Sequence, residues 1–294
     1  MKLAVQIVAL LLSAAALAGA QSGASPSVWT VKTEPQELVN GSPVLFRVQA
    51  PGDLADLGGM WSERELSFRH SAGCDCWYAL AGVDLNQKPG KYLLRLEGKE
   101  KDGAKASFAA QINVGEKAYP TTKLSVPPQY VAPPKEVLAR IQEEEALKKR
   151  LFSAVTPETY WSGRFAPPVS SSVTAVFGSA RTYNHGLQKS QHKGLDFRAA
   201  VGTTVKATNR GVVILARNLY YEGNCVVVDH GQGLLTLYLH FSEIAVKEGD
   251  KVESGTVLGK SGNTGRVNGP HLHFAARWQG LYVDPETLLT LSMP

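Results

Sequence analysis

Pro270-His271-Leu272-His273-Phe274 is the stretch that decides how the last third of this chain folds and where its chemistry lies. On a β-strand, His271 and His273 project from the same face, about 6.5 Å apart. One of them can therefore bind a metal ion while the other stands beside the open coordination position. A metal-dependent hydrolase needs that arrangement.

A second stretch, His192-Lys193-Gly194-Leu195-Asp196, offers another histidine and a carboxylate. On an extended strand, positions four apart are separated by about 13 Å, whereas two zinc ligands place their donor atoms about 2 Å from one ion. The chain must therefore bend between His192 and Asp196, and Gly194 gives it that freedom. Taken together with His240, these residue types predict a hydrolytic zinc site.

Histidine is concentrated towards the C-terminus, where six of the seven histidines follow residue 180. Besides the four named above, these are His185 and His230. We expect His230 to end a strand at a turn. His185 lies in a predicted loop that could line a substrate groove, since loops carry function disproportionately.

Glycine recurs at short intervals between valine-rich runs from Tyr160 onward. Such spacing predicts tight turns in an all-β domain. The region resembles the lysostaphin-type (LytM-like, M23) family of zinc peptidoglycan endopeptidases, almost continuously from about Phe165 to Leu288. The resemblance is carried by Phe177-Gly178, His192-Lys193-Gly194-Leu195-Asp196, Gly223-Asn224, Val228-Asp229-His230-Gly231, Tyr238-Leu239-His240, Gly249-Asp250-Lys251-Val252, Ser261-Gly262-Asn263-Thr264-Gly265, Gly269-Pro270-His271-Leu272-His273-Phe274 and Val283-Asp284-Pro285.

The resemblance implies an antiparallel β-sheet peptidase domain over residues 160–294, with Zn²⁺ bound by His192, Asp196 and His273. It also implies that His240 and His271 flank the metal-bound water, which acts as the nucleophile, and the scissile carbonyl. Which of these two histidines is the general base stays open. The implied activity is hydrolysis of peptide bonds in peptidoglycan cross-links or stem peptides. Glycyl bridges, diaminopimelate cross-links and glycine-rich protein all stay open as targets.

The N-terminal part, residues 21–118, has the composition of a separate β-domain. A chain of 294 residues predicts about two domains, and 44% apolar residues are enough to bury a core. Apolar residues alternate with other residues in short runs between the turn pairs Asn40-Gly41, Pro89-Gly90 and Asp102-Gly103, which predicts an immunoglobulin-like β-sandwich. The alternating residues are Val44, Phe46 and Val48, then Tyr92, Leu94 and Leu96, then Phe108, Ala110 and Ile112.

A proline-rich linker and a helix join the two parts over residues 119–159. Prolines at 120, 127, 128, 133 and 134 predict about fifteen residues without a regular strand ladder. Lys135 to Phe152 then has a broken apolar stripe, which predicts a helix that leans against a domain of the same chain. We also expect this helix or the β-sandwich to cover the substrate groove until it is released.

The first twenty residues predict a signal peptide. Lys2 precedes an apolar run from Leu3 to Leu17, and Ala18-Gly19-Ala20 is the small-residue pattern that signal peptidase accepts. The run is shorter than the roughly 20 residues of a spanning helix, so a retained membrane anchor is disfavoured. We therefore expect export to the periplasm or the cell wall, with no stable membrane insertion after cleavage.

The charge of the mature chain disfavours nucleic acid as a partner. Removing Lys2 leaves 30 basic and 26 acidic residues, a net charge of +4 that is spread along the chain. No cluster of lysine and arginine forms a nucleic-acid patch, whereas an anionic wall polymer is compatible with this charge. We expect peptidoglycan peptides as partners, and the oligomeric state stays open.

Three cysteines would meet an oxidising environment after export. Cys74 and Cys76 are close enough to bridge each other in a strained ring, and a metal pair is the weaker alternative. Cys225 lies in a predicted buried strand, and we expect it to be a small core residue.

Two further functions stay open beside the enzyme. A non-enzymatic wall-binding regulator or activator of other hydrolases fits the same fold. A biotinyl-type or lipoyl-type carrier domain is suggested by Val246-Lys247-Glu248-Gly249-Asp250-Lys251-Val252. The carrier interpretation leaves the histidine set unexplained.

Overall fold

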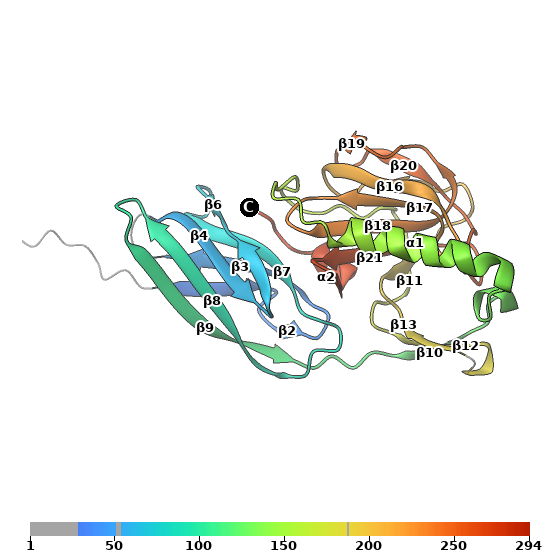
Figure 1. The fold of residues 1–294 in the computed structure, drawn as a ribbon, viewed down its shortest axis with the longest axis horizontal. Coiled ribbons are helices and arrows are strands. Elements are labelled where there is room, and N and C mark those ends of the chain that lie inside the picture. Colours follow the sequence, from blue (N-terminus) through green and yellow to red (C-terminus); the bar gives the residue numbers. More distant parts are fainter. Residues whose placement is uncertain (1–28, 51–53, 187) are drawn as a thin grey trace, which may run out of the picture.

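The structure is a computed structural model that describes residues 29–50, 54–186 and 188–294. The predicted signal peptide lies outside these described residues. Within the described ranges most regular structure is β, and no helix there is long and apolar enough to cross a bilayer. Figure 1 shows an N-terminal and a C-terminal part side by side, with the C-terminus of the chain between them.

Two sheets form the N-terminal part, and their residues share one apolar core. Pairing is antiparallel except between β2 and β9. The immunoglobulin type of the sandwich stays a prediction. The first sheet has the order β1 (Thr30–Glu34), β3 (Pro43–Gln49), β7 (Cys76–Gly82), β6 (Arg69–Ser71). The second has the order β2 (Leu38–Val39), β9 (Lys105–Gly115), β8 (Gly90–Glu100), β4 (Leu54–Trp61), β5 (Arg64–Ser67).

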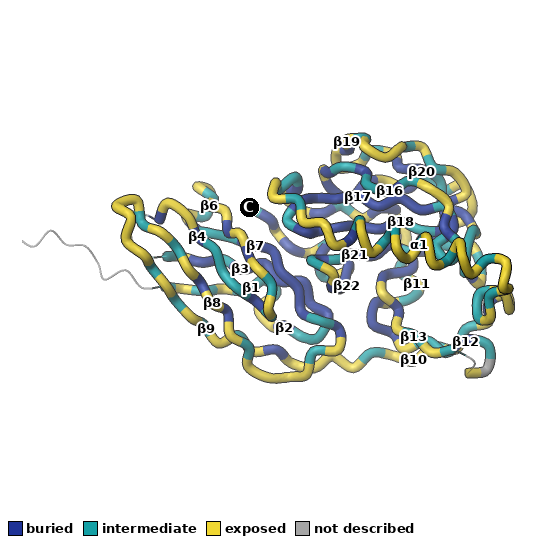
Figure 2. Tube along the Cα trace, viewed as in Figure 1, coloured by how far each residue is buried: buried dark blue, intermediate teal, exposed yellow. Residues whose placement is uncertain are grey.

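The predicted alternation is confirmed in β8, where Leu94 and Leu96 are buried and Leu93 is exposed. It is wrong at Leu45 in β3, which is as fully buried as Phe46. The reason is tertiary, because the β3–β7 sheet contacts elements of the C-terminal part, which covers its second face. Figure 2 shows the resulting burial of this sheet.

The C-terminal part is built on one ten-stranded antiparallel sheet, as expected. Its main path runs β11 (Val173–Ala175), β14 (Leu195–Phe197), β21 (Leu272–Trp278), β18 (Leu234–Ile244), β17 (Gly223–Asp229), β16 (Gly211–Leu219), β19 (Lys251–Val252). Off this path lie β15 (Thr204–Lys206), β20 (Val257–Ser261) and β22 (Leu281–Val283). The short helix α2 (Pro285–Leu288) follows.

The expected ladder-free linker is wrong in one segment. β10 (Thr121–Leu124) pairs in parallel with β12 (Ala180–Tyr183), and β13 (Gln188–Gln191) completes a three-stranded sheet. Residues 121–124 contain no proline, so their backbone N–H groups are available to a ladder. A short 3₁₀ helix, η1 (Pro128–Tyr130), occupies part of the remaining linker.

The predicted helix is present as α1 (Lys135–Ser153), and it leans against the C-terminal part as expected. Its last turn buries Phe152 in a cluster with residues of β16, β17 and β18. Figure 1 shows α1 lying across this side of the sheet.

Two of the three cysteines form a disulfide, and the third is a free thiol. Cys74 and Cys76 form a disulfide. Cys225 is a buried free thiol in β17, so its prediction as a core residue is confirmed. The domain boundaries at 118 and 160 stay predictions.

Candidate metal centre

The central strand β21 brings the site together, because its two neighbours carry the other site residues. Asp196 of β14 is the register partner of His273. On the other side of β21, Leu239 of β18 is the partner of the same histidine, and His240 follows it. His271 comes just before β21, in an isolated bridge to Gly262.

His192 reaches the same point through the bend predicted at Gly194. A Cβ atom at Gly194 would lie 2.4 Å from the Phe274 carbonyl oxygen and 2.7 Å from Nε2 of His273. Real Cβ atoms do not approach that closely, so the absence of a side chain lets the chain lie close against β21. The bend therefore needs glycine for space.

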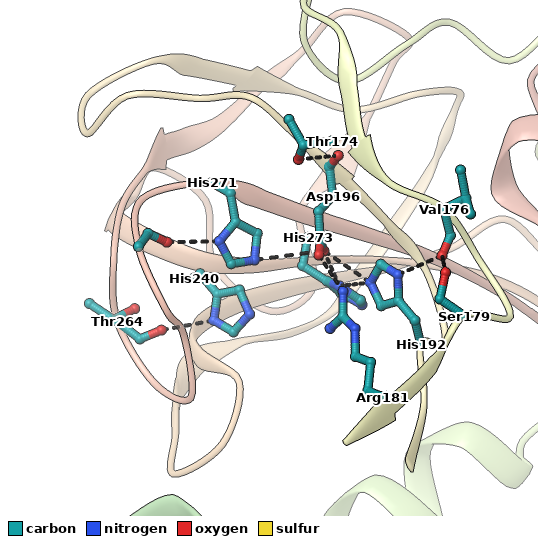
Figure 3. Close-up of polar contacts among 11 residues, drawn as sticks. Thr174, Val176, Ser179, Arg181, His192, Asp196, His240, Thr264, His271 and His273 are labelled. Atoms are coloured by element: carbon teal, nitrogen blue, oxygen red, sulfur yellow. Dashed lines mark hydrogen bonds and ion pairs between the residues drawn. The ribbon is translucent and has the colours of Figure 1, made fainter. Parts of the chain in front are cut away.

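Three donor atoms converge on one point, as Figure 3 shows. His192 Nε2 lies 3.0 Å from Asp196 Oδ1 and 3.0 Å from His273 Nδ1, and the last two atoms are 2.8 Å apart. Ligand atoms at tetrahedral zinc, each about 2 Å from the ion, are about 3.3 Å from one another. The donor types and their separations therefore fit a zinc ion with small adjustments.

Backbone carbonyls fix the orientation of the His192 and His240 rings, since a carbonyl oxygen can only accept a hydrogen bond. Nδ1 of His192 donates to the Val176 carbonyl at 2.8 Å, which leaves Nε2 to face the other ligands. Nδ1 of His240 donates to the Thr264 carbonyl at 2.8 Å.

His271 follows the same pattern, donating from Nδ1 to the Gly269 carbonyl at 2.8 Å. Its Nε2 lies 3.6 Å from Asp196 Oδ1. The rings of His240 and His271 have centroids 5.0 Å apart. Two imidazoles thus stand beside the three ligands, each with Nε2 left for a substrate or a water molecule.

His240 holds its place through an irregular backbone. Its φ of 69° is in the left-handed region, which is uncommon for any residue except glycine. The β17–β18 register shifts here, since Val226 pairs with Tyr238 but Asn224 pairs with Phe241. One extra residue on β18 makes a bulge, and bulges re-aim side chains next to active sites.

Burial and hydrogen bonds set the protonation states that a metal site requires. Burial by itself raises the pKa of Asp196, but the polar contacts with His192 and His273 outweigh it and hold that pKa well below its usual value. Burial lowers the pKa of His273 to about 4, against the opposing pull of the Asp196 carboxylate. Burial, then the nearby His271 and His273, lower the pKa of His240 well below its usual value. At neutral pH the carboxylate is ionised, and His240 and His273 are neutral.

Arg181 is a site residue that the sequence did not suggest. Its guanidinium donates from Nη2 to Asp196 Oδ2 at 2.5 Å, so it holds the carboxylate oxygen that does not face the histidines. Arg181 lies on β12, fifteen positions before Asp196. No local motif links the two, because the β12–β13 hairpin brings them together.

A cavity of about 320 Å³ opens beside these residues. Its walls include Asp196, His240 and His271, together with loop 266–270 and residues of β10 and β12. Residues from the two N-terminal sheets and from α1 are not among those that line it in the described part of the chain. The former linker segment, through Thr122, Leu124 and Val126, is the part from outside the predicted peptidase domain that borders the site.

The other two late histidines lie elsewhere. His230 follows the end of β17, as expected, and is fully buried. It donates from Nδ1 to the Arg210 carbonyl at 2.7 Å, and its Nε2 lies 2.7 Å from Thr236 Oγ1. His185 lies in the short 3₁₀ helix η2 (Asn184–Gly186), and its role at a groove stays a prediction.

Comparisons with known proteins agree on one family for this region. Residues 190–285 match the model of peptidase family M23. Peptidoglycan DD-endopeptidase ShyA of Vibrio cholerae is 45% identical over 109 residues, which are 36% of this chain and 25% of that protein. DD-carboxypeptidase/endopeptidase Mpg of Neisseria meningitidis is 43% identical over 94 residues, 32% of this chain and 22% of that protein.

The chain thus matches about a quarter of the length of these curated relatives. A crystal structure from Pseudomonas aeruginosa, named as a candidate M23 peptidase, matches with a TM-score of 0.65 and 29% identity. That likeness covers 86% of this chain and 95% of the other, so it extends beyond the family match into the N-terminal part.

Proposed function

Because residues 190–285 of this chain form a metallopeptidase domain of family M23, we propose that the protein is an exported zinc endopeptidase of peptidoglycan. It hydrolyses peptide bonds in the cross-links or stem peptides, with a metal-bound water as nucleophile. The observation that carries the proposal is the convergence of three donor atoms, within 4.8 Å of one another, beside two further histidines at the wall of a cavity.

His192, Asp196 and His273 would hold the zinc ion. Two neutral imidazoles and one carboxylate are a ligand set typical of hydrolytic zinc, and they leave a fourth position open. When bound, zinc polarises the peptide carbonyl and lowers the pKa of a water molecule to about 7. Arg181 keeps Asp196 oriented through the carboxylate oxygen that the histidines do not use.

His240 and His271 handle protons. Each donates from Nδ1 to a backbone carbonyl, so each presents Nε2 as its working atom. One ring accepts the proton of the attacking water, and the other, once protonated, stabilises the negative charge on the carbonyl oxygen. Which ring does which stays open, since both line the same cavity.

The substrate class is supported by ShyA, which is named as a peptidoglycan DD-endopeptidase, and the endopeptidase activity also by the name of Mpg. Export is supported by the apolar run and small-residue site in residues 1–20. Export and the substrate class belong to the same proposal, because peptidoglycan lies outside the cytoplasmic membrane.

The test measures metal content and wall hydrolysis on the same samples. Purified protein starting after residue 20 should contain about one zinc per chain and release peptides from isolated sacculi. His192→Ala should lose both zinc and activity, because two donor atoms cannot hold the ion tightly. His70→Ala is the matched control, since His70 is a partly exposed histidine on β6.

Zinc-loaded protein that leaves sacculi and defined cross-linked peptides intact would contradict the proposal. In that case the non-enzymatic wall-binding regulator would be the better reading. Mass spectrometry of the released products identifies the bond that is cleaved.

A further inference from the structure

Besides Arg181, Arg266 is a second cationic residue at the wall of the cavity beside the metal centre. It lies in the loop between β20 and β21, and it lines the same cavity as Asp196, His240 and His271. It belongs to none of the histidine or aspartate motifs in the sequence.

The guanidinium of Arg266 is held between two aromatic rings. Its central carbon is 5.1 Å from the ring centroid of Tyr183 and 4.9 Å from that of Tyr221. The backbone N–H of Arg266 donates to the Tyr221 carbonyl at 2.8 Å, which fixes the base of the side chain. The group is therefore oriented before any ligand arrives, so binding costs less side-chain entropy.

Most hydrogen-bond donors of Arg266 are unused. A guanidinium has five N–H donors, and here one contact is present, from Nη1 to Gln188 Oε1 at 3.4 Å. In the part of the chain that the structure describes, Arg266 forms no ion pair with an acidic side chain. Arg181 contrasts with it, because its guanidinium is already paired with Asp196.

The free edge of such a guanidinium matches a carboxylate, which it binds through two parallel N–H···O bonds. Resting on the proposed function, we propose that Arg266 binds a free carboxylate of the peptide substrate close to the scissile bond. The enzyme then selects cross-links that contain a diamino acid with a free α-carboxylate. It discriminates against glycyl bridges, because glycine within a bridge has no side-chain or free carboxylate.

Two carboxylates can meet this description, and matched substrates separate them. One belongs to the diamino acid within the cross-link, and the other ends the peptide strand. We therefore compare three cross-linked peptides: one with both carboxylates free, one with the diamino-acid carboxylate converted to a carboxamide, and one with the terminal carboxylate converted to a carboxamide.

The zinc-loaded wild-type protein should cleave the fully free peptide with kcat/KM about 10 to 100 times that for the diamino-acid carboxamide, mainly through KM. In Arg266→Gln this ratio should fall to about 1. Arg266→Lys should give an intermediate ratio, because lysine keeps the charge but lacks the fork. Arg150→Gln, an exposed arginine on α1, should leave the ratio unchanged.

Three results would overturn the inference. Wild-type protein could treat the free peptide and the diamino-acid carboxamide alike. Preference could instead follow the terminal carboxylate. Arg266→Gln could lower the rate on all three peptides equally, which would mean that Arg266 only stabilises its loop through the contacts with Tyr183 and Tyr221.

A binding measurement separates this inference from the proposed function. Titration calorimetry of metal-free protein with the same peptides needs no cleavage. Tighter binding of the free carboxylate by wild type but not by Arg266→Gln supports the role of Arg266 even if no peptide is hydrolysed. Equal binding of the free and carboxamide peptides by wild type contradicts it, and thermal unfolding of each variant shows whether it is folded.

Discussion

Gly194 shows how one residue sets the geometry of the metal centre. It has no side chain at the point where the chain lies close against β21, and an added Cβ would meet the Phe274 carbonyl oxygen at 2.4 Å and His273 Nε2 at 2.7 Å. Because one of these atoms is backbone, the strand itself would have to shift. His192 and Asp196, on either side of the glycine, would shift with it.

We expect Gly194→Ala to destabilise the metal-free protein by about 1 to 3 kcal/mol, the usual cost of overpacking. Its zinc affinity should fall at least tenfold, because the donor atoms no longer converge. Denaturant unfolding and competition with a chelator measure the two effects. Gly58→Ala is the control, since its Cβ would have its nearest neighbour at an ordinary 3.6 Å. A Gly194→Ala protein with wild-type zinc affinity would rule out this steric account.

His230 is a buried histidine that the chemistry does not use. Burial lowers its pKa to about 4, although the hydrogen bond to the Arg210 carbonyl opposes the shift. In the unfolded chain a histidine has a pKa of about 6.5. Below pH 6.5 the unfolded chain therefore binds a proton that the native protein does not bind, which favours unfolding.

The stability from neutral His230 is fully present above about pH 6.5 and is lost as the pH falls towards 4. The difference of about 2.5 pKa units corresponds to about 3 kcal/mol. We expect the imidazole of His230 to titrate near pH 4 by NMR in metal-free protein. The loss of stability between pH 6.5 and 4 should be smaller in His230→Gln than in wild type. It should not vanish, because burial also lowers the pKa of His273 in both proteins. A titration midpoint near 6.5 would refute the prediction.

At the scale of elements, α1 is fixed to the sheet by its last turn and by polar contacts. Phe152 packs with residues of β16 to β18, and its ring lies 4.7 Å from the guanidinium carbon of Arg277. Earlier in the helix, Lys148 is paired with Glu222 at 2.5 Å and Glu144 accepts from the Tyr220 N–H at 2.7 Å. The apolar stripe indicated such packing, but the partners lie more than 60 residues further along the chain.

Phe152→Ala should lower the free energy of unfolding by about 3 kcal/mol, because it removes a buried ring and leaves a cavity. Helix α1 should then exchange its amide hydrogens faster than β17. Val155→Ala, at an exposed valine just after the helix, should change stability by less than about 0.5 kcal/mol. Both are measured by denaturant unfolding and hydrogen exchange. Unchanged protection of α1 in Phe152→Ala would contradict this role of the last turn.

The former linker segment is the second element whose role the structure changes. Val126 donates its N–H to Asn184 Oδ1 and accepts from Asn184 Nδ2, both at 2.9 Å, so the asparagine extends the β10–β12 ladder by one step. The segment borders the cavity at the metal centre, whereas residues of α1 and of the N-terminal sheets do not line it in the described ranges. Autoinhibition by α1 or the sandwich stays a prediction.

At the scale of the whole molecule, the two parts share a core. One buried cluster contains Val44 and Phe46 from the N-terminal sheets together with Trp278 and Val283 from the C-terminal part. A Cβ at Gly82 would lie 2.7 Å from Val283 Cγ1, so the parts meet without space between them. We infer that neither part unfolds alone, because each would expose this cluster.

Calorimetry of the wild-type protein should therefore show one cooperative unfolding transition. Gly82→Val should wedge the contact apart and split the transition into two, with zinc shifting only the one that belongs to the peptidase domain. Gly73→Ala, whose nearest new neighbour is a side-chain oxygen at 3.6 Å, should keep a single transition. Two transitions in the wild type would show that the parts are independent.

The sequence by itself determined the features that depend on local spacing. Alternation in β8, the stripe of α1, the bend at Gly194 and the paired histidines at the start of β21 are all encoded within a few residues, because strand and helix periods are local properties. The grouping of His192, Asp196, His240, His271 and His273 was also available from motifs. Their assigned roles stay predictions.

Only the tertiary structure decided the features that join distant segments. The burial of Leu45 depends on the C-terminal part, the strand β10 depends on β12, and Arg181 reaches Asp196 through a hairpin. Arg266 acquires its orientation from two tyrosines, of which Tyr183 is 83 positions away and Tyr221 is 45. No local pattern encodes such contacts, because they arise from the free energy of packing whole elements together.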